Sequence, residues 1–367
     1  MRAAKARVGV FAVEDTTIQV TWGALPAGHV SIEAAGRVAE IEIDGGPGAL
    51  ELEGLLMATE HETRANGPGL PIGGSMMATR TLAPPPGEEL CRVATISDLH
   101  LGSDRVGIPP IAESGALGDL PPVRCARAAI AEGLAWGADL LVVKGDVTDH
   151  GTADEWALAA DLLADLPVPV VVVPGNHDVG DDRPLDTGSL AVVRGTAVRD
   201  LPGLRVVAVD TTVPGRHRGR IAPAHDAVLD ALAGAPGGAL VLLHHQLQDR
   251  PYPPLWPPGV PRPDATRFLD AVAAAHPATL VSSGHTHRHR RRRHGLVTVT
   301  QVGSTKDYPG TWAGYAVHEG GVRQVVRRVA APDAIAWSER TRRARFGLWG
   351  HWSPGRLDDR CFTVLWP

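Results

Sequence analysis

Apolar and polar residues alternate along the first part of the chain. Between residues 7 and 56 the alternation is clear around Ile18, Val20 and Trp22, and glycine-rich turns such as Gly45 to Gly48 separate the alternating segments. A period of two is typical of strands with one buried face. The pattern therefore predicts short antiparallel strands that form a small all-β sandwich.

The pattern changes after residue 90, where short continuous apolar runs alternate with helical stretches. Continuous runs predict strands buried on both faces, as in a sheet covered by helices. One helix is predicted from Pro122 to Trp136, and Thr152 with Glu155 has the spacing of a capping box that opens another. The fold class is therefore α/β with layered sheets. The predicted strands are 138–143, 168–173, 204–209, 239–243, 279–282, 296–302 and 315–318.

Residues that break regular structure are concentrated between Asn66 and Gly87. Runs of proline and glycine are typical of linkers between domains. We predict a β-sandwich domain over residues 1–83, an α/β domain over 88–330 and a C-terminal tail over 331–367 that packs on the α/β domain.

Charge and composition exclude several classes of protein. A net charge of −5 gives no overall basic surface, so the sequence disfavours nucleic acid as a partner. No segment reaches the ~18 apolar residues of a membrane span, and the apolar run that ends at Val13 is too short for a secretory signal. The three cysteines are widely spaced and form no disulfide framework, which favours a reducing cytoplasm. A homodimer is left open.

Short polar clusters follow five of the apolar runs. Loops at the carboxyl ends of the strands in an open α/β sheet converge on one edge, which is where such folds bind their ligands. Carboxylate, amide and imidazole groups without thiolate suit divalent manganese, iron, cobalt, nickel or zinc. The clusters are Asp98 to His100, Gly145 to Asp146, Gly175 to Asp178, His244 to His245 and Gly284 to His287.

The local spacing supports a metal site. Asp98 and His100 are two residues apart at a strand end, so their side chains point the same way and can share one ion. Gly145, Gly175 and Gly284 let the backbone turn closely beside the ions.

In this order, the five clusters resemble those of the calcineurin-like metallophosphoesterases over residues 91 to 330. The resemblance implies a four-layer αββα sandwich and two divalent metal ions, manganese, iron, zinc or cobalt, with a bridging hydroxide that attacks phosphorus in line with the leaving oxygen. It assigns one ion to Asp98, His100, Asp146 and His287 and the other to Asp146, Asn176, His244 and His285.

The same resemblance makes His177 a catalytic residue that donates a proton to the leaving group or stabilises charge on the phosphoryl oxygens. Asp178 or Asp149 would orient His177, and Asp178 is our predicted catalytic partner. Substrate contacts are predicted for Asn176, His177 and His245. Several other histidines, His217 among them, are assigned no role.

Two positions depart from the patterns of related proteins. Gln246 takes the place of a proline that follows the histidine pair in many relatives, which leaves the geometry of this loop open while His244 remains the preferred ligand. Asp149 stands where purple acid phosphatases have an iron-binding tyrosine, so a tyrosinate-bound iron is not expected.

Two segments are predicted to form walls of the pocket. One is the loop from Gly102 to Pro121, and the other is the proline-rich segment 250–258, in which Tyr252 or Trp256 would stack on a base or anchor the loop. The basic run 288–294 is interpreted as a solvated hairpin turn in preference to a phosphate-binding patch.

The segment from Gly145 to Gly151 is most similar to bacterial cyclic-nucleotide phosphodiesterases of this family. We therefore expect hydrolysis of a phosphodiester, either a cyclic nucleotide or a glycerophosphodiester, with a broad phosphomonoesterase as the alternative. A non-catalytic binding scaffold is the alternative of another class. The N-terminal region resembles a fibronectin-III-like domain and would suit that scaffold as an interaction module.

Overall fold

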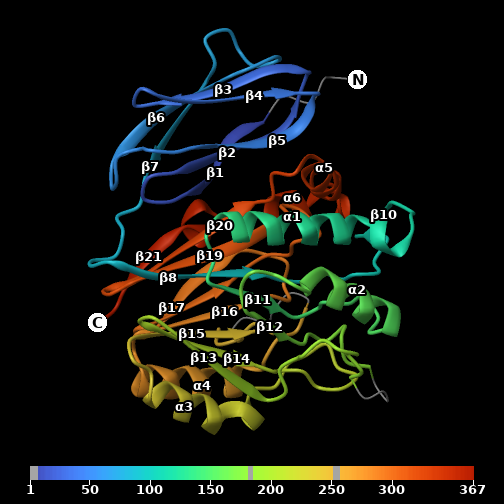
Figure 1. Ribbon diagram of the computed structural model, residues 1–367, viewed down its shortest axis with the longest axis vertical. Helices are drawn as coiled ribbons and strands as arrows, with labels where there is room; N and C mark the ends of the chain where they lie inside the picture. The colour runs from blue at the N-terminus through green and yellow to red at the C-terminus, as the bar shows by residue number, and fades with distance from the viewer. Residues whose placement is uncertain (1–6, 181–184, 251–256) are drawn as a thin grey trace.

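The computed structural model describes residues 7–180, 185–250 and 257–367 of the chain. The N-terminal strands form two antiparallel sheets, drawn in blue in Figure 1, with the orders β1–β2–β5 and β4–β3–β6–β7. These strands are β1 (Val8–Val13), β2 (Ile18–Leu25), β3 (Gly28–Ala34), β4 (Arg37–Ile43), β5 (Gly46–Leu52), β6 (Glu60–Asn66) and β7 (Ser75–Arg80).

The two N-terminal sheets pack on one another because alternate side chains point inwards. Exposed and buried residues alternate along β6, and Ile18, Ile32 and Leu52 from both sheets share one core. The predicted all-β region is therefore confirmed. Its likeness to a fibronectin-III domain stays a prediction.

The short strands β9 (Arg105–Val106) and β10 (Ile111–Ala112) form a small two-stranded sheet. Two six-stranded sheets form the rest of the fold, with the orders β12–β11–β8–β19–β20–β21 and β13–β14–β15–β16–β18–β17. The first contains β8 (Glu89–Ile96), β11 (Leu140–Lys144), β12 (Val170–Val173), β19 (Thr311–His318), β20 (Gly321–Arg328) and β21 (Phe362–Leu365). The second contains β13 (Thr196–Leu201), β14 (Leu204–Val209), β15 (Gly238–Leu243), β16 (Thr279–Ser283), β17 (Arg290–His294) and β18 (Val297–Gln301). Parallel pairing joins β8, β11 and β12 in the first sheet and β14, β15, β16 and β18 in the second.

Helices cover the outer face of each sheet, so the layers run helix, sheet, sheet, helix (Figure 1). In β11, Leu140 and Val142 face the other sheet, whereas Leu141 and Val143 face the helices. This is why the strand is apolar from Leu140 to Val143, as the sequence predicts, before it ends at Lys144. The helices of the first sheet are α1 (Pro121–Ala135), α2 (Ala153–Leu163) and α5 (Pro332–Thr341), and those of the second are α3 (His225–Ala233) and α4 (Arg262–Ala275). The α/β fold class is confirmed.

The N-terminal sheets and the C-terminal tail are both tied to β20. Gln19 in β2 exchanges two hydrogen bonds of 2.9 Å with the backbone of Arg328, and Glu14 pairs with Arg323 at 3.0 Å. At the other end of the chain, β21 pairs with β20 and completes the first sheet. The division into domains at residues 83–88 and 330–331 stays a prediction.

The helix α2 begins with the capping box that its sequence predicts. Thr152 Oγ1 accepts the Glu155 N–H at 3.3 Å, and Glu155 Oε2 accepts the Thr152 N–H at 3.0 Å. Because Thr152→Ala removes an acceptor for an otherwise unpaired amide, we expect it to lower the free energy of unfolding by about 1 kcal/mol. Urea denaturation would measure this change. Thr152→Ser keeps the hydroxyl and should remain close to wild type, and an equal loss in both variants would contradict the capping role.

The basic run is predicted to be a solvated turn, but residues Arg290–His294 form β17, the edge strand that pairs with β18. Arg292 donates to Asp249 at 2.7 Å, so part of the run is held by an acidic partner. None of the helices in the described ranges combines the length and apolar character needed to span a membrane.

Candidate metal centre

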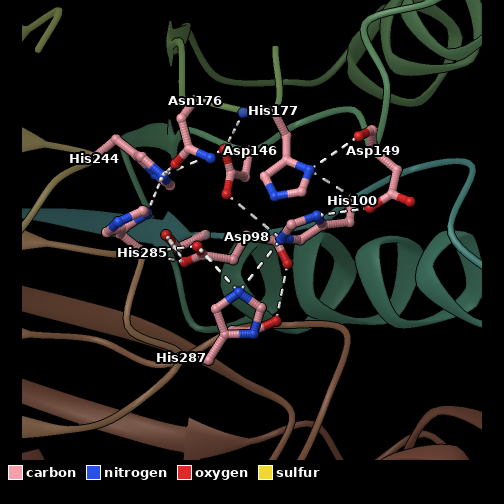
Figure 2. Close-up of polar contacts among 12 residues, drawn as sticks. Asp98, His100, Asp146, Asp149, Asn176, His177, His244, His285 and His287 are labelled. Carbon is pink, nitrogen blue, oxygen red and sulfur yellow. Dashed lines mark hydrogen bonds and ion pairs between the residues drawn. The ribbon is translucent and has the colours of Figure 1, made fainter. Parts of the chain in front are cut away.

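The predicted polar clusters come together at the carboxyl ends of β8, β11, β12, β15 and β16. Figure 2 shows their side chains converging from loops that are far apart in the sequence. The two sheets present these loops at the same edge, as expected for parallel strands. The labelled side chains are Asp98, His100, Asp146, Asp149, Asn176, His177, His244, His285 and His287.

Five of the predicted ligands have a left-handed backbone conformation. A residue other than glycine in this region costs on the order of 1–3 kcal/mol, and such strain is concentrated at functional sites. Neighbouring loops hold the strained turns, since the His100 N–H donates to Asp146 O at 2.8 Å. The φ values are 54° for Asp98, 48° for His100, 47° for Asp146, 67° for His285 and 51° for His287.

Two of the predicted glycines are required by close packing against carboxylates. A Cβ atom at Gly175 would lie 2.2 Å from Asp146 Oδ1, and one at Gly284 would lie 2.6 Å from Asp98 Oδ2. Any larger residue would push these carboxylates out of place. The loops of β12 and β16 therefore fix the two acidic side chains of the site.

One group of possible ligands consists of Asp98, His100 and His287, whose ligand atoms lie within 4.8 Å of one another. His287 Nε2 is 3.4 Å from Asp98 Oδ1 and 3.3 Å from His100 Nε2. Asp146 Oδ2 approaches the same group, at 3.5 Å from His100 Nε2.

The second group surrounds His244, which is fully buried. Its Nε2 atom is 3.1 Å from His285 Nδ1, 3.3 Å from Asn176 Oδ1 and 3.3 Å from Asp146 Oδ1. Asp146 thus turns one carboxylate oxygen towards each group.

The hydrogen bonds of the four imidazoles indicate that this donor set fits divalent cations. In each ring one nitrogen contacts an oxygen that can only accept, so that nitrogen carries the proton. The other nitrogen of a neutral ring then points a lone pair into the cluster, the arrangement typical of metal-binding histidines. The outer contacts are His100 Nδ1 to Asp149 Oδ1 at 2.9 Å, His244 Nδ1 to Lys144 O at 2.9 Å, His285 Nε2 to Pro258 O at 3.1 Å and His287 Nδ1 to Asp307 Oδ2 at 2.7 Å.

The electrostatics of the cluster favour bound cations. Burial raises the pKa of Asp146, but His244 outweighs it and holds the pKa well below its usual range. Burial lowers the pKa of His287, yet Asp307 and Asp98 raise it to about 10. His287 therefore carries a positive charge where it faces the carboxylates, which is the position in which a metal ion would replace the proton.

His177 differs from the predicted ligands because its side chain is partly exposed. Its side chain is 36% exposed, and its Nδ1 atom contacts the Asp149 carbonyl oxygen at 2.9 Å. Because a carbonyl only accepts, Nδ1 carries a proton and Nε2 is left to face other groups. The backbone N–H of His177 donates to Asp146 Oδ1 at 2.9 Å, which fixes its distance from the cluster.

Asp178 lies behind the site, where it holds two loops together. Its carboxylate accepts the backbone N–H groups of Gly175 at 2.7 Å and Thr148 at 2.8 Å. Burial and the nearby charge of Asp146 raise the pKa of Asp178 to about 6. Among the described residues its hydrogen bonds do not include His177, so the predicted orientation of His177 by this carboxylate is not what the contacts show. The Asp149 backbone makes that contact.

The burial of His245 argues against its predicted contact with the substrate. His245 is fully buried, and Thr211 Oγ1 lies 2.8 Å from its Nδ1 atom. The loop geometry left open at Gln246 is now defined, because the Gln246 side chain donates to Pro257 O at 2.9 Å. Tyr252 and Trp256, predicted to stack on a base, lie outside the described residues.

A cavity of about 310 Å³ opens beside the cluster. Its walls include His177, His217 and residues of the predicted wall 102–121, such as Val106. His217, to which the sequence assigned no role, lies with its Nδ1 atom 3.3 Å from Asn176 Nδ2. A larger cavity of about 740 Å³ lies between β5 and β20 and is lined by other residues, such as Glu51 and Arg327.

Sequence reasoning missed Asp307, which holds His287, and the cavity wall formed by Arg345, Trp349 and Trp352. Asp307 lies in the loop that follows β18, but six residues beyond the end of the strand, so only its place after an apolar run was a signal. The C-terminal wall has no comparable pattern.

Comparisons with known proteins agree with this arrangement. Residues 91–289, more than half of the chain, match the family model described as calcineurin-like phosphoesterase. A probable cyclic nucleotide phosphodiesterase of a Synechococcus species is 30% identical over 56% of this chain and 77% of its own length. One from Rhodococcus erythropolis is 34% identical over 29% of this chain and 38% of its own length. A probable glycerophosphodiester phosphodiesterase of Arcobacter nitrofigilis is 30% identical over 22% of this chain and 31% of its own length.

Proposed function

Since the chain belongs to the calcineurin-like phosphoesterase family and is a hydrolase of phosphoric esters, we propose that it is a phosphodiesterase. It acts with two divalent metal ions on a cyclic nucleotide or a similar small diester. The relatives named as probable phosphodiesterases support the diester. The observation that carries the two-ion proposal is the buried Asp146 carboxylate, whose oxygens face separate groups of imidazoles.

The proposed ligand sets follow from this division. Asp146 belongs to both sets, because its Oδ2 atom faces His100 and its Oδ1 atom faces His244. The Asn176 side chain turns its oxygen towards His244 and its NH2 group towards His217, which supports the amide oxygen as a ligand. One ion is assigned to Asp98, His100, Asp146 and His287, and the other to Asp146, Asn176, His244 and His285.

A divalent cation in such a site lowers the pKa of water and offsets the negative charge of phosphoryl oxygens. The chain itself supplies the groups that orient the substrate and move protons. His177 is exposed to the cavity and keeps the proton on Nδ1 through the Asp149 carbonyl. When the ring is protonated on both nitrogens, its Nε2–H donates the second proton to the leaving oxygen of the ester and the ring returns to its neutral form. We propose His177 as the catalytic acid and as a substrate contact together with Asn176.

Asp178 is proposed as a positioning residue, because its carboxylate fixes the turn that carries Asn176 and His177. His245 is also proposed as a positioning residue. Its ring centroid is 4.9 Å from that of His244 and 4.7 Å from that of His285, so it packs behind two proposed ligands.

Asp307→Asn is expected to weaken manganese binding by about 10–100-fold, the range found when a partner that orients a metal-binding histidine is lost. The carboxylate lies 2.7 Å from His287 Nδ1 and keeps the proton on the outer side of the ring. Equilibrium dialysis with manganese would measure the change. Asp226→Asn is a matched control, because the Asp226 side chain is 97% exposed. Unchanged affinity in Asp307→Asn would count against His287 as a ligand.

The proposed activity is tested by comparing bis(p-nitrophenyl) phosphate with p-nitrophenyl phosphate on manganese-loaded protein. Faster hydrolysis of the diester is expected. Activity on the monoester alone would favour a phosphomonoesterase. Purified protein that binds no divalent metal and hydrolyses neither ester would favour a binding scaffold.

The identity of the metal ions and the location of the protein in the cell are also proposals. Manganese, iron, zinc and cobalt all suit the oxygen and imidazole donors. A reducing cytoplasmic location is supported by Cys91, Cys125 and Cys361, which are all buried and free.

A further inference from the structure

The C-terminal segment that contains Arg345, Trp349 and Trp352 forms one wall of the cavity beside the proposed metal ligands. α6 (Trp349–Trp352) carries the two tryptophans. This segment lies beyond residues 91–289, the part of the chain that matches the family model. The wall is therefore built from residues outside the matched part of the chain.

Contacts with the last ligand loop hold the wall in place. Arg288, the residue after His287, stacks on Trp352 with its guanidinium carbon 4.2 Å from the ring centroid. The ring of Trp349 lies 6.2 Å from that of His287. The wall is thus attached directly to the loop that carries a proposed ligand.

The opposite side of the segment packs against another wall of the cavity. A Cβ atom at Gly107 would lie 2.6 Å from the Cβ atom of Ala344, so the two segments touch with no space for a larger side chain. Both Gly107 and Ala344 line the cavity. The backbone on either side of Arg345 is therefore held in place, while the Arg345 side chain is exposed.

Two polar groups of this wall have no protein partner among the described residues. The Arg345 guanidinium makes no ion pair or side-chain hydrogen bond there, and its contact is the Trp349 ring at 5.4 Å. The second group is the Trp349 Nε1–H, which lacks an acceptor in a residue that is only 8% exposed. By contrast, Arg105 lines the same cavity and donates to Asp104 at 2.6 and 3.0 Å.

A buried N–H donor without an acceptor, such as Trp349 Nε1–H, lowers the stability of the fold. A ligand that supplies an acceptor would remove this cost. Arginine binds phosphate and carboxylate groups through several N–H donors at once. Indole rings offer flat apolar surface to a planar group. The wall therefore combines a cation, a donor and aromatic surface around one cavity.

We propose that Arg345 is a specificity-determining residue that pairs with a negatively charged group of the substrate, while Trp349 and Trp352 contact its planar part. This inference rests on the proposed phosphodiesterase function and names the part of the site that selects the substrate. The charge has two possible sources in a nucleotide ester: the phosphate that reacts, or a second phosphate elsewhere on the nucleotide.

The test compares two p-nitrophenyl esters of thymidine 5′-phosphate, one with and one without a 3′-phosphate, on manganese-loaded protein. We expect Arg345→Gln to raise KM about fivefold with kcat nearly unchanged, because a contact made equally in the bound and transition states acts on KM. Arg345→Lys should recover part of the loss. Arg343→Gln is the matched control, since Arg343 is exposed on the same segment and lies outside the cavity lining.

The two sources of charge give different results. An equal rise in KM for both esters would identify the reacting phosphate, and a larger rise for the 3′-phosphorylated ester would identify the second group. Unchanged KM for both esters, or an equal rise in Arg343→Gln, would overturn the proposal.

A binding experiment separates this inference from the proposed activity. Thymidine 5′-phosphate and thymidine 3′,5′-bisphosphate are titrated calorimetrically into the manganese-loaded wild type and Arg345→Gln proteins. Weaker binding of at least one nucleotide by Arg345→Gln is expected even if the wild type hydrolyses neither ester. Equal binding by both proteins would refute the role of Arg345, whereas inactive wild type with an Arg345-dependent affinity would refute the proposed activity alone.

Discussion

An Asp146→Asn protein is expected to lose at least about 10³-fold of its phosphodiesterase activity, since loss of a residue that merely orients a metal ligand already costs about 10–100-fold. Asp146 is 2% exposed, and its two oxygens lie 3.3 Å from His244 Nε2 and 3.5 Å from His100 Nε2. Asparagine keeps the shape but replaces one oxygen by an NH2 donor and removes the negative charge. The affinity for both proposed metal ions would therefore fall together.

Steady-state kinetics with bis(p-nitrophenyl) phosphate and elemental analysis of bound manganese would measure the two effects of Asp146→Asn. Circular dichroism would show that the variant remains folded. Asp226→Asn, at an exposed position of α3, should retain wild-type activity and metal content. If Asp146→Asn kept activity within tenfold of wild type, the shared ligand would be refuted.

A His177→Asn protein is expected to lose about 10²–10⁴-fold in kcat with a diester whose leaving group is an alcohol, the range typical of a lost general acid. The loss should be much smaller with bis(p-nitrophenyl) phosphate, because p-nitrophenolate departs without needing a proton. Manganese content should be unchanged, because the imidazole lies with its Nδ1 atom on the Asp149 carbonyl and its side chain open to the cavity.

The comparison of leaving groups separates a proton donor from a metal ligand. Parallel assays of a cyclic nucleotide and the p-nitrophenyl diester would give the two losses. His29→Asn is a suitable control, since His29 is a half-exposed residue of β3 with no place in the cavity. Equal losses with both leaving groups, or a loss of bound manganese, would contradict the acid role.

The parts of the fold that the sequence predicts well are those in which local pattern and burial agree. Strand β11 is apolar from Leu140 to Val143 because both of its faces are covered, and β2 contains the predicted alternation of Ile18, Val20 and Trp22, whose side chains are all buried. β20 was not predicted, since its sequence contains Arg323, Gln324 and Arg328, all of them buried. Arg323 and Arg328 have partners more than three hundred positions away, Glu14 and Gln19, which no local pattern can reveal. The Gln324 side chain donates to Arg360 O in the C-terminal tail.

In the candidate site, too, some residues could be predicted from the local sequence and others depend on distant contacts. Its proposed ligands follow strand ends, so sheet topology alone gathers them. The roles of Asp178 and His245 were harder to predict, because they depend on contacts with loops distant in the sequence. Asp178 turns away from His177 to bind backbone amides, and His245 turns into the core beside Thr211. Arg345 reaches the cavity only through the path of the C-terminal tail.

The central claim is that two cations bind on either side of the Asp146 carboxylate. The most direct measurement is the anomalous scattering of a crystal of the manganese-loaded protein. Two peaks are expected, one among Asp98, His100 and His287 and one among Asn176, His244 and His285, with an Asp146 oxygen between them. A single peak, or none, with these side chains otherwise placed as described would contradict the claim.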